Sequence, residues 1–304
     1  MEAERSAVVR AAAGQALSRR EFGGVAVSGL FAGVSPRPVH RSLGEGGQSS
    51  ANVTIGVQSY SFRDRTLEQA IAAMQQVGLR SCELWQEHAE PRGLPREAKR
   101  RWRETMSLDH FHRIRDQFAR ASIALSAYNI SIKDDFSDTE IERAFEMTAA
   151  LGAPVITSSS NIATVARIVP VAERRKMLVG MHNHSRVDAN EFATARSLAD
   201  ALQKSRYIAA NLDIGHFTAA NEDAVAFLNQ HHARTVMLHL KDRRRDQGPN
   251  VEFGAGDSPV AEVLKLVSAR RWPIPMNIEY EYPGGDPVDE VKKCLAYCRR
   301  VLNL

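Results

Sequence analysis

From Val53 onward, short apolar runs alternate with segments whose apolar residues recur every three or four positions. The runs are mostly continuous and rich in Val, Ile and Leu, which is typical of strands buried on both faces. The intervening segments have the spacing of amphipathic helices. Phe111, Ile114 and Phe118, for example, would share one face of a helix over 108–122. The pattern therefore predicts alternating strands and helices.

The predicted strands cover residues 53–62, 81–85, 123–130, 154–159, 178–184, 207–217, 235–242 and 274–282. The predicted helices cover residues 66–78, 108–122, 137–152, 162–176, 189–203, 221–233, 258–271 and 286–302. Thr66 and Gly78 are suitable cap residues for the first helix, and Ser137 with Glu140 forms a capping-box pattern.

Eight strand–helix pairs in about 250 residues predict a single-domain α/β fold, a (β/α)8 TIM barrel over residues 53–304. A doubly wound parallel sheet is the competing fold. It usually has fewer strands and often a glycine-rich phosphate loop after the first one, whereas "SYSFRDRT" (59–66) contains no glycine. The barrel is therefore the favoured prediction.

The first 52 residues have a different composition. "SRREFGGVAVSGLFAG" (18–33) joins Arg19, Arg20 and Phe22 to a weakly apolar stretch and resembles a twin-arginine export signal. An ordinary amphipathic helix is the alternative. The stretch is shorter than the ~20 residues that span a bilayer, so no stable membrane insertion is expected. We predict a signal region at 1–33, a linker at 34–52, and transport by the twin-arginine machinery to the periplasm.

The charge balance gives little sign of a nucleic-acid partner. The net charge is +4, and the first fifty residues contribute six Arg and four Glu. The remainder has 34 basic and 32 acidic groups, which argues against binding to nucleic acid. Basic clusters at 96–104 and 241–247 are read as solvated faces. Three cysteines are too few for a disulfide framework.

Polar side chains gather at the predicted carboxyl ends of strands, where TIM barrels hold their active groups. They are Glu83, His182, His184, Asp213, His216, His239, Lys241, Glu279 and Glu281. One inward residue from each of the last four strands gives His182, Asp213, His239 and Glu279. Two imidazoles and two carboxylates suit Mn²⁺, Co²⁺, Zn²⁺ or Fe²⁺, and suit Mg²⁺ less well. Taken singly, each residue could instead be a structural hydrogen-bonding partner.

The segments "NLDIGHF", "MLHLKDR", "FGAGD" and "NIEYE" follow one another in an order that resembles the xylose isomerase-like TIM-barrel superfamily. That superfamily contains sugar isomerases and epimerases, inosose dehydratases and endonuclease IV. The resemblance covers about residues 53–302. It implies that Asp213, His239 and Glu279 bind a divalent metal and that His216 lies beside the substrate. It also implies that "FGAGD" (253–257) is a Gly-x-Gly loop rather than a plain turn.

The fifth strand departs from the family pattern. Epimerases of the family usually have glutamate where this sequence has His182, in the stretch "HNH" (182–184). Their two-glutamate mechanism would retain only Glu279 here, which favours the dehydratase or lyase branch. Either His182 or His184 could be the ligand on this strand, and His182 is favoured because it matches the glutamate position.

We expect the metal to polarise a substrate carbonyl and to stabilise an enediolate formed on deprotonation. The predicted catalytic residues are His184, His216, Lys241 and Glu279, and both histidines are expected to titrate near neutral pH. The predicted substrate-binding residues are Glu83, Trp85 and Tyr60. For Glu83 a structural role is the alternative, and for the two aromatic rings it is packing at the barrel rim.

These observations predict a divalent-metal-dependent isomerase or epimerase that acts on a keto- or aldo-sugar or a cyclitol. A metal-dependent keto-sugar dehydratase or lyase is the main alternative. An endonuclease IV-like phosphodiesterase and a sugar-binding barrel without catalysis are weaker alternatives. A homodimer is one expectation for the assembly, and residues 86–107 are expected to form a lid or a subunit contact.

Overall fold

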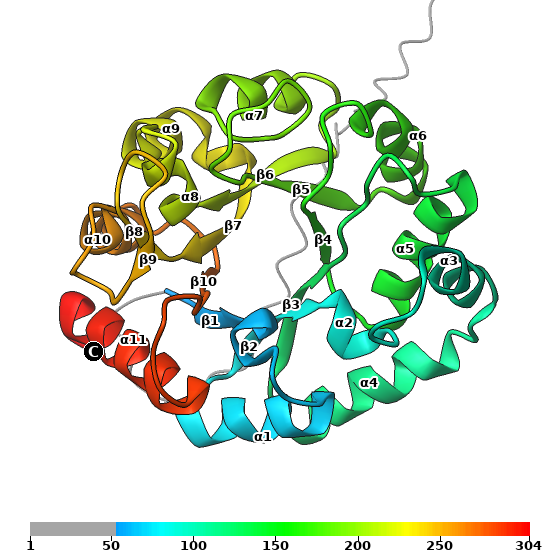
Figure 1. Ribbon diagram of the computed structural model, residues 1–304, viewed down its shortest axis with the longest axis horizontal. Helices are drawn as coiled ribbons and strands as arrows, with labels where there is room; N and C mark the ends of the chain where they lie inside the picture. Colours follow the sequence, from blue (N-terminus) through cyan, green and yellow to red (C-terminus); the bar gives the residue numbers. More distant parts are fainter. Residues whose placement is uncertain (1–52) are drawn as a thin grey trace, which may run out of the picture. The chain divides into compact units, whose positions relative to one another are not determined.

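The computed structural model describes residues 53–304, which form a closed barrel of eight parallel strands inside a ring of helices (Figure 1). The barrel strands are β1 (Ile55–Gln58), β2 (Ser81–Trp85), β3 (Ala124–Asn129), β4 (Val155–Ser158), β5 (Leu178–His182), β6 (Ile208–Asp213), β7 (Thr235–Leu240) and β10 (Met276–Ile278). Their order around the barrel is β1-β10-β7-β6-β5-β4-β3-β2. The predicted TIM barrel is thus confirmed. The predicted signal region and linker lie outside the described residues.

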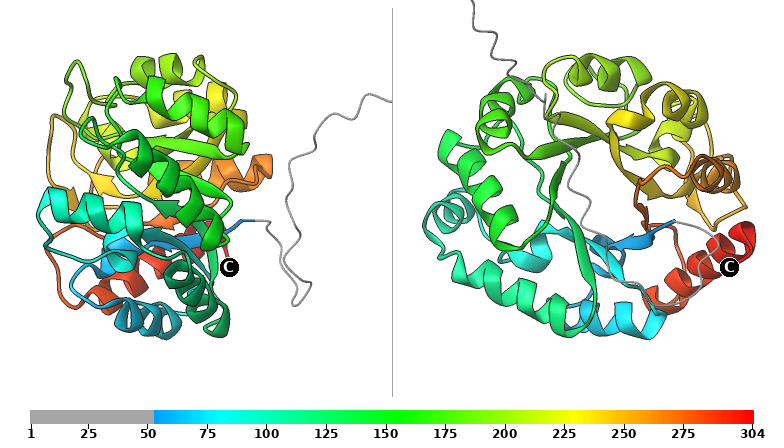
Figure 2. Two further views of the ribbon diagram at one scale, coloured as in Figure 1. Left: turned by 90° about the vertical axis from the view of Figure 1, so that its right-hand side faces the viewer. Right: turned by 180° about the vertical axis from the view of Figure 1, so that it is seen from behind.

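Helices cover the outer surface of the strands, as the views from the side and from behind show (Figure 2). They are α1 (Leu67–Val77), α2 (Gln86–Ala89), α3 (Arg96–Thr105), α4 (Asp109–Arg120), α5 (Asp138–Ala150), α6 (Val165–Arg175), α7 (Ala195–Leu202), α8 (Ile214–Ala219), α9 (Ala224–His231), α10 (Val260–Arg270) and α11 (Pro287–Leu302). Two short 3-10 helices, at Ser59–Phe62 and His232–Arg234, and a small hairpin of β8 (Asp242–Arg243) and β9 (Asn250–Val251) complete the described part. Within residues 53–304, no helix is both long and apolar enough to cross a membrane.

The predicted caps form as the sequence indicates. The Thr66 hydroxyl accepts from the backbone N–H of Gln69, whose side chain accepts from the N–H of Thr66 in return. The same reciprocal pair links Ser137 and Glu140 at the start of α5. Each capping box satisfies backbone donors that the first helical turn leaves unpaired.

Most strands are shorter than predicted, and two of them, β6 and β10, end at or just before a candidate carboxylate. β6 stops at Asp213, because the carboxylate of Asp213 accepts from the N–H of His216 at 2.7 Å and caps the helix α8. β10 stops at Ile278, although the N–H of Glu279 still donates to Leu240 O at 3.0 Å. Both carboxylates therefore lie where the chain leaves the barrel.

The segment 86–107 contains α2 and α3, which the sequence pattern did not predict. Arg103 on α3 is buried and forms ion pairs with Glu90 at 2.8 Å and with Glu140 of α5 at 3.3 Å. The reading of 96–104 as a solvated face is therefore wrong for Arg103. These contacts attach the segment to the outer wall of the barrel.

Candidate metal centre and active site

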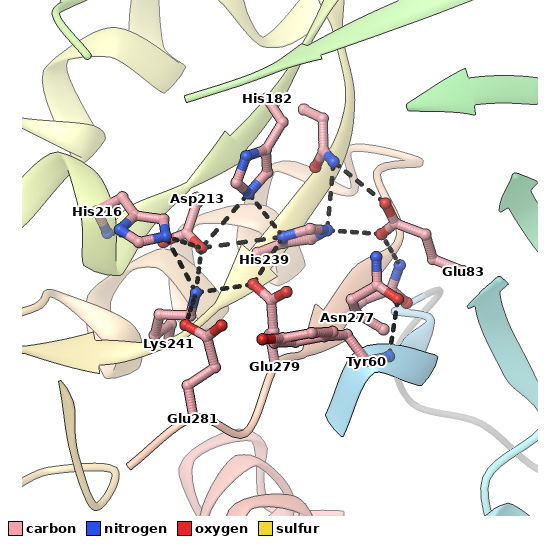
Figure 3. A network of polar contacts seen from close by, with 12 residues as sticks. Tyr60, Glu83, His182, Asp213, His216, His239, Lys241, Asn277, Glu279 and Glu281 are labelled. Carbon is pink, nitrogen blue, oxygen red and sulfur yellow. Dashed lines mark hydrogen bonds and ion pairs between the residues drawn. The ribbon is translucent and has the colours of Figure 1, made fainter. Parts of the chain in front are cut away.

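Four side chains converge at the end of the barrel where the strands finish, here called the mouth (Figure 3). They are His182 from β5, Asp213 from β6, His239 from β7 and Glu279 just after β10, and all four are buried. One ligand atom from each lies within 4.8 Å of the other three. His239 Nδ1 is 3.1 Å from His182 Nε2 and 3.0 Å from Glu279 Oε2. These are the four residues that the sequence suggested as metal ligands.

Neighbouring groups hold the outward atoms of three of these side chains and direct the inward atoms toward one another. His182 Nδ1 lies 3.3 Å from the Ser159 hydroxyl, so Nε2 faces the cluster. His239 Nε2 donates to Glu83 at 2.6 Å, so Nδ1 faces the cluster. Asp213 Oδ1 accepts from the backbone of His216, which leaves Oδ2 directed inward. Such outer contacts fix the tautomer and the direction of metal ligands.

The donor set fits a divalent cation. Asp213 Oδ2 and Glu279 Oε2 are buried and form ion pairs with Lys241, but neither makes a hydrogen bond of regular geometry within the described residues. A bound ion at ~2.1 Å keeps its ligand atoms ~3–4 Å apart, and Asp213 Oδ2 lies 3.6 Å from His182 Nε2 and 3.8 Å from His239 Nδ1. Two nitrogen and two oxygen donors favour Mn²⁺, Fe²⁺, Co²⁺ or Zn²⁺ over Mg²⁺.

Lys241 places a buried ammonium beside this cluster. Its Nζ lies 3.0 Å from Asp213 Oδ2, 2.8 Å from Glu279 Oε2 and 2.6 Å from Glu281 Oε2. Burial by itself would lower the pKa of Lys241, but these carboxylates raise it well above its usual value. Lys241 is therefore a cation at neutral pH. Gly215 makes room for it, because a Cβ at that position would lie 2.8 Å from Lys241 Cγ.

The same charges keep the neighbouring acids ionised. Burial alone would raise the pKa of Asp213, but Lys241 and then His216 hold it well below its usual value. The pKa of Glu279 is also lowered, with Lys241 and His239 opposing the effect of burial. Both carboxylates are available as anionic ligands at neutral pH.

Neither remaining histidine titrates near neutral pH, so that expectation was wrong. Burial and then the neighbouring His182 lower the pKa of His184 to about 3. Burial and Lys241 lower the pKa of His216 as well. His216 Nδ1 lies 2.7 Å from the Arg243 guanidinium and its Nε2 lies 3.2 Å from the Lys241 ammonium, so a donor faces each nitrogen of the ring. His184 is half-buried, and its Nδ1 lies 3.5 Å from Glu191.

The glycine-rich loop wraps around the carboxylate of Asp242. The backbone N–H groups of Gly254, Gly256 and Ser258 donate to it at 2.8–3.1 Å. A Cβ at Gly256 would lie 2.0 Å from Asp242 Oδ1, so only glycine fits there. The neighbouring Arg243 is held by Gly248 O and reaches His216. The loop thus holds Asp242 in place beside Arg243, the residue that contacts His216 at the mouth.

Glu83 lies deeper than the sequence suggested. It is 0% exposed and sits on the far side of His239 from the other ligands, inside the barrel (Figure 3). It has no surface from which to meet a substrate at the mouth. Sequence reasoning placed Glu83 at the rim from its position on β2, and instead the structure gives it His239 as a partner.

Tyr60 and Trp85 form an aromatic wall at the rim. Their rings pack edge to face with centroids 4.9 Å apart. The Arg63 guanidinium lies 4.8 Å from the centre of the Tyr60 ring, and Arg92 lies 5.3 Å from that of Trp85. Both rings are half-buried. Part of each ring therefore remains accessible.

Sequence reasoning did not identify the partners of the candidate ligands and acids. Ser159, Glu191 and Arg243 each contact a histidine of the site. Arg243 follows directly on "HLKD", but it falls in the basic cluster 241–247 that was read as solvated. No residue type or spacing singles out the other two.

Comparison with protein-family models gives a match to the xylose isomerase-like TIM barrel over residues 71–301. The chain therefore belongs to this family, as its motifs suggested. A search among curated protein sequences gave no match.

Solved structures agree in fold at low identity. An L-ribulose 3-epimerase matches with a TM-score of 0.64 and 14% identity, over 83% of this chain and 95% of that one. A protein from Bacillus anthracis described as the "probable 3-DHS dehydratase" matches with a TM-score of 0.62 and 17% identity, over 83% and 99%. A 3-keto-D-glucoside 4-epimerase from E. coli matches with a TM-score of 0.61 and 13% identity, over 82% and 99%. Such identities establish a shared fold.

Proposed function

We propose that this protein is a divalent-metal-dependent isomerase or epimerase. It would remove a proton from the carbon next to the carbonyl group of a sugar or cyclitol and then return a proton to the substrate. One observation carries this proposal: two imidazoles and two carboxylates converge in a buried cluster, with one ligand atom of each within 4.8 Å of the others. The sugar epimerases among the structural neighbours support the substrate class.

His182, Asp213, His239 and Glu279 would hold the ion. When bound, a divalent cation polarises a carbonyl oxygen and stabilises an enediolate. The two anionic ligands offset the charge of the ion in a buried site, where uncompensated charge is costly.

The other groups at the mouth manage protons. His184 is neutral and can accept a proton from substrate carbon. Lys241 carries a proton, and it can stabilise a developing oxyanion or return a proton to it. His216 lies between the Arg243 guanidinium and the Lys241 ammonium and helps to position both cations at the mouth.

Tyr60 and Trp85 supply an apolar surface beside these polar groups. Sugar rings present C–H faces that pack on aromatic side chains, while their hydroxyls seek hydrogen bonds. The wall formed by Tyr60 and Trp85 is thus suited to orient the substrate.

A keto-sugar dehydratase or lyase is the second candidate, because His182 occupies the position on β5 where two-base epimerases have a carboxylate. In that case one base would remove the proton from carbon. The Lys241 ammonium would protonate the departing hydroxyl group, which would leave as water. The dehydratase among the structural neighbours supports this candidate.

The two candidates differ in what happens to the mass of the substrate. The Mn²⁺-loaded protein would be incubated in D₂O with a panel of keto-sugars and cyclitols, and the products followed by mass spectrometry and NMR. Deuterium uptake at the carbon next to the carbonyl, without water loss, is the expected result. Water loss would favour the dehydratase, and no change with any compound, in the presence of bound metal, would contradict both.

We also propose export through the twin-arginine pathway, on the strength of Arg19, Arg20 and Phe22. Expression with Arg19 and Arg20 both replaced by Lys, followed by cell fractionation, tests this. Equal amounts of wild type and variant in the periplasm would contradict it.

A further inference from the structure

Inside the barrel, on the far side of His239 from the other candidate ligands, a buried carboxylate accepts an unusual number of hydrogen bonds. Glu83 on β2 is 0% exposed. Five side chains from five other strands donate to it, namely Asn129 of β3, Thr157 of β4, Asn211 of β6, His239 of β7 and Asn277 of β10. TIM-barrel interiors are usually filled by Val, Ile and Leu. The polar filling here therefore calls for a role other than packing.

The two oxygens of Glu83 divide the donors between them. Oε2 accepts from His239 Nε2 at 2.6 Å and from Asn277 Nδ2 at 3.0 Å. Oε1 accepts from the other three side chains. Only an ionised carboxylate accepts at both oxygens, since a side-chain amide would turn an NH₂ group toward some of these donors. The surroundings thus select glutamate in its charged form.

This arrangement determines which nitrogen of His239 faces the candidate ligands. A proton on Nε2 is required for the 2.6 Å bond to Glu83, and Nδ1 then points toward Asp213 and Glu279. The Asn211 amide nitrogen lies 3.2 Å from the same Nε2, but it is a donor and cannot take over from Glu83.

We propose that Glu83 is a positioning residue, which locks His239 in the tautomer that offers Nδ1 to the metal and aims the ring at the other three ligands. The inference rests on the proposed metal-dependent function. Partners of this kind typically change metal affinity by roughly 10–100-fold when they are replaced. The substrate-binding role predicted for Glu83 is replaced by one exerted through His239.

The test compares Glu83→Gln with Glu90→Gln, a matched change at a buried glutamate that pairs with Arg103 and touches no candidate ligand. Mn²⁺ affinity is measured by isothermal titration calorimetry on metal-free protein. Histidine tautomers are read by NMR on ¹⁵N-histidine-labelled, Zn²⁺-loaded protein. We expect one Mn²⁺ per wild-type chain, roughly 10–100-fold weaker binding for Glu83→Gln, and wild-type affinity for Glu90→Gln.

The NMR spectrum of the wild type provides a test that does not depend on how a variant folds. A proton on His239 Nε2 in the Zn²⁺-loaded protein is expected, and a proton on Nδ1 would overturn the proposal. Equal Mn²⁺ affinity of folded Glu83→Gln and wild type would overturn it too. In both outcomes the proposed function survives, whereas a wild type that binds no ion would remove the proposed function and this inference together.

Discussion

Two buried ionic clusters lie in this barrel, and they differ in how completely they are paired. In the Arg103 cluster, formed by Arg96, Arg103, Glu90, Glu140 and Tyr128, every carboxylate oxygen accepts at least one hydrogen bond. In the candidate metal centre, formed by His182, Asp213, His239 and Glu279, two carboxylate oxygens form ion pairs but no hydrogen bond of regular geometry. Apart from Arg96, whose side chain is 35% exposed, the residues of both clusters are buried.

The difference separates a structural role from a binding role. Buried polar groups are normally satisfied, because each unpaired one costs free energy. The Arg103 cluster follows this rule and fastens α3 to α5. The candidate metal centre follows it less completely, because one oxygen each of Asp213 and Glu279 forms ion pairs but no hydrogen bond of regular geometry, at the mouth of a fold that places its active sites there. Incomplete hydrogen bonding thus supports a ligand site here together with the donor set and its position at the mouth.

The largest effect on stability is expected from Arg103→Ala. The change leaves Glu90 buried without its cationic partner, so the free energy of unfolding should fall by about 3–5 kcal/mol. Denaturant unfolding of the metal-free protein measures it. Mn²⁺ affinity of the folded variant should match the wild type, and a selective loss of affinity would mean that the two clusters are coupled.

A smaller effect is expected from the protonation of His88 at acid pH, which should lower the free energy of unfolding by about 2 kcal/mol. His88 is buried and lies outside both clusters. Burial and then Arg92 lower the pKa of His88 to about 4 from 6.5. The unfolded chain therefore binds this proton more readily, and stability is lost as the pH falls from about 6.5 to about 4.

Urea unfolding at pH 7.5 and at pH 5 measures this loss, and His88→Gln should show about 2 kcal/mol less of it than the wild type. The clusters are unchanged in the variant, so the difference isolates His88. Identical losses in the two proteins would assign the acid sensitivity to the clusters instead.

The smallest effect on stability is expected from Asp213→Asn, less than about 1 kcal/mol in the metal-free protein. The change removes an ion pair with Lys241, but it also removes the repulsion between the Asp213 and Glu279 carboxylates, and Lys241 keeps both Glu279 and Glu281 as partners. Thermal unfolding with and without Mn²⁺ measures it. The wild type should gain stability from the metal and the variant should not. A destabilisation as large as that of Arg103→Ala would erase the distinction between the clusters.

The barrel and the grouping of the four candidate ligands were predictable because both follow from local pattern. Continuous apolar runs mark buried strands, and a closed parallel barrel brings the carboxyl ends of those strands together. His182, Asp213, His239 and Glu279 each stand at such an end. No knowledge of the long-range packing was needed for these residues.

The depth of Glu83 and the pairing of Arg103 were not predictable in this way. The register between β2 and β3 shifts between Cys82 and Glu83, and that between β6 and β7 shifts between Ala210 and Asn211. Such irregularities decide which side chains point inward, and simple alternation does not reveal them. Arg103 meets Glu90 and Glu140 only because α3 packs beside α5, a contact without a signal in the local sequence.

The central claim is that four side chains at the barrel mouth bind one divalent cation, and crystals of the Mn²⁺-loaded protein test it most directly. The account predicts a single strong anomalous peak in contact with His182 Nε2, Asp213 Oδ2, His239 Nδ1 and Glu279 Oε2. It also predicts that the peak is absent from Asp213→Asn crystals grown in the same way. No peak in the wild type, or one that persists in the variant, would contradict the account.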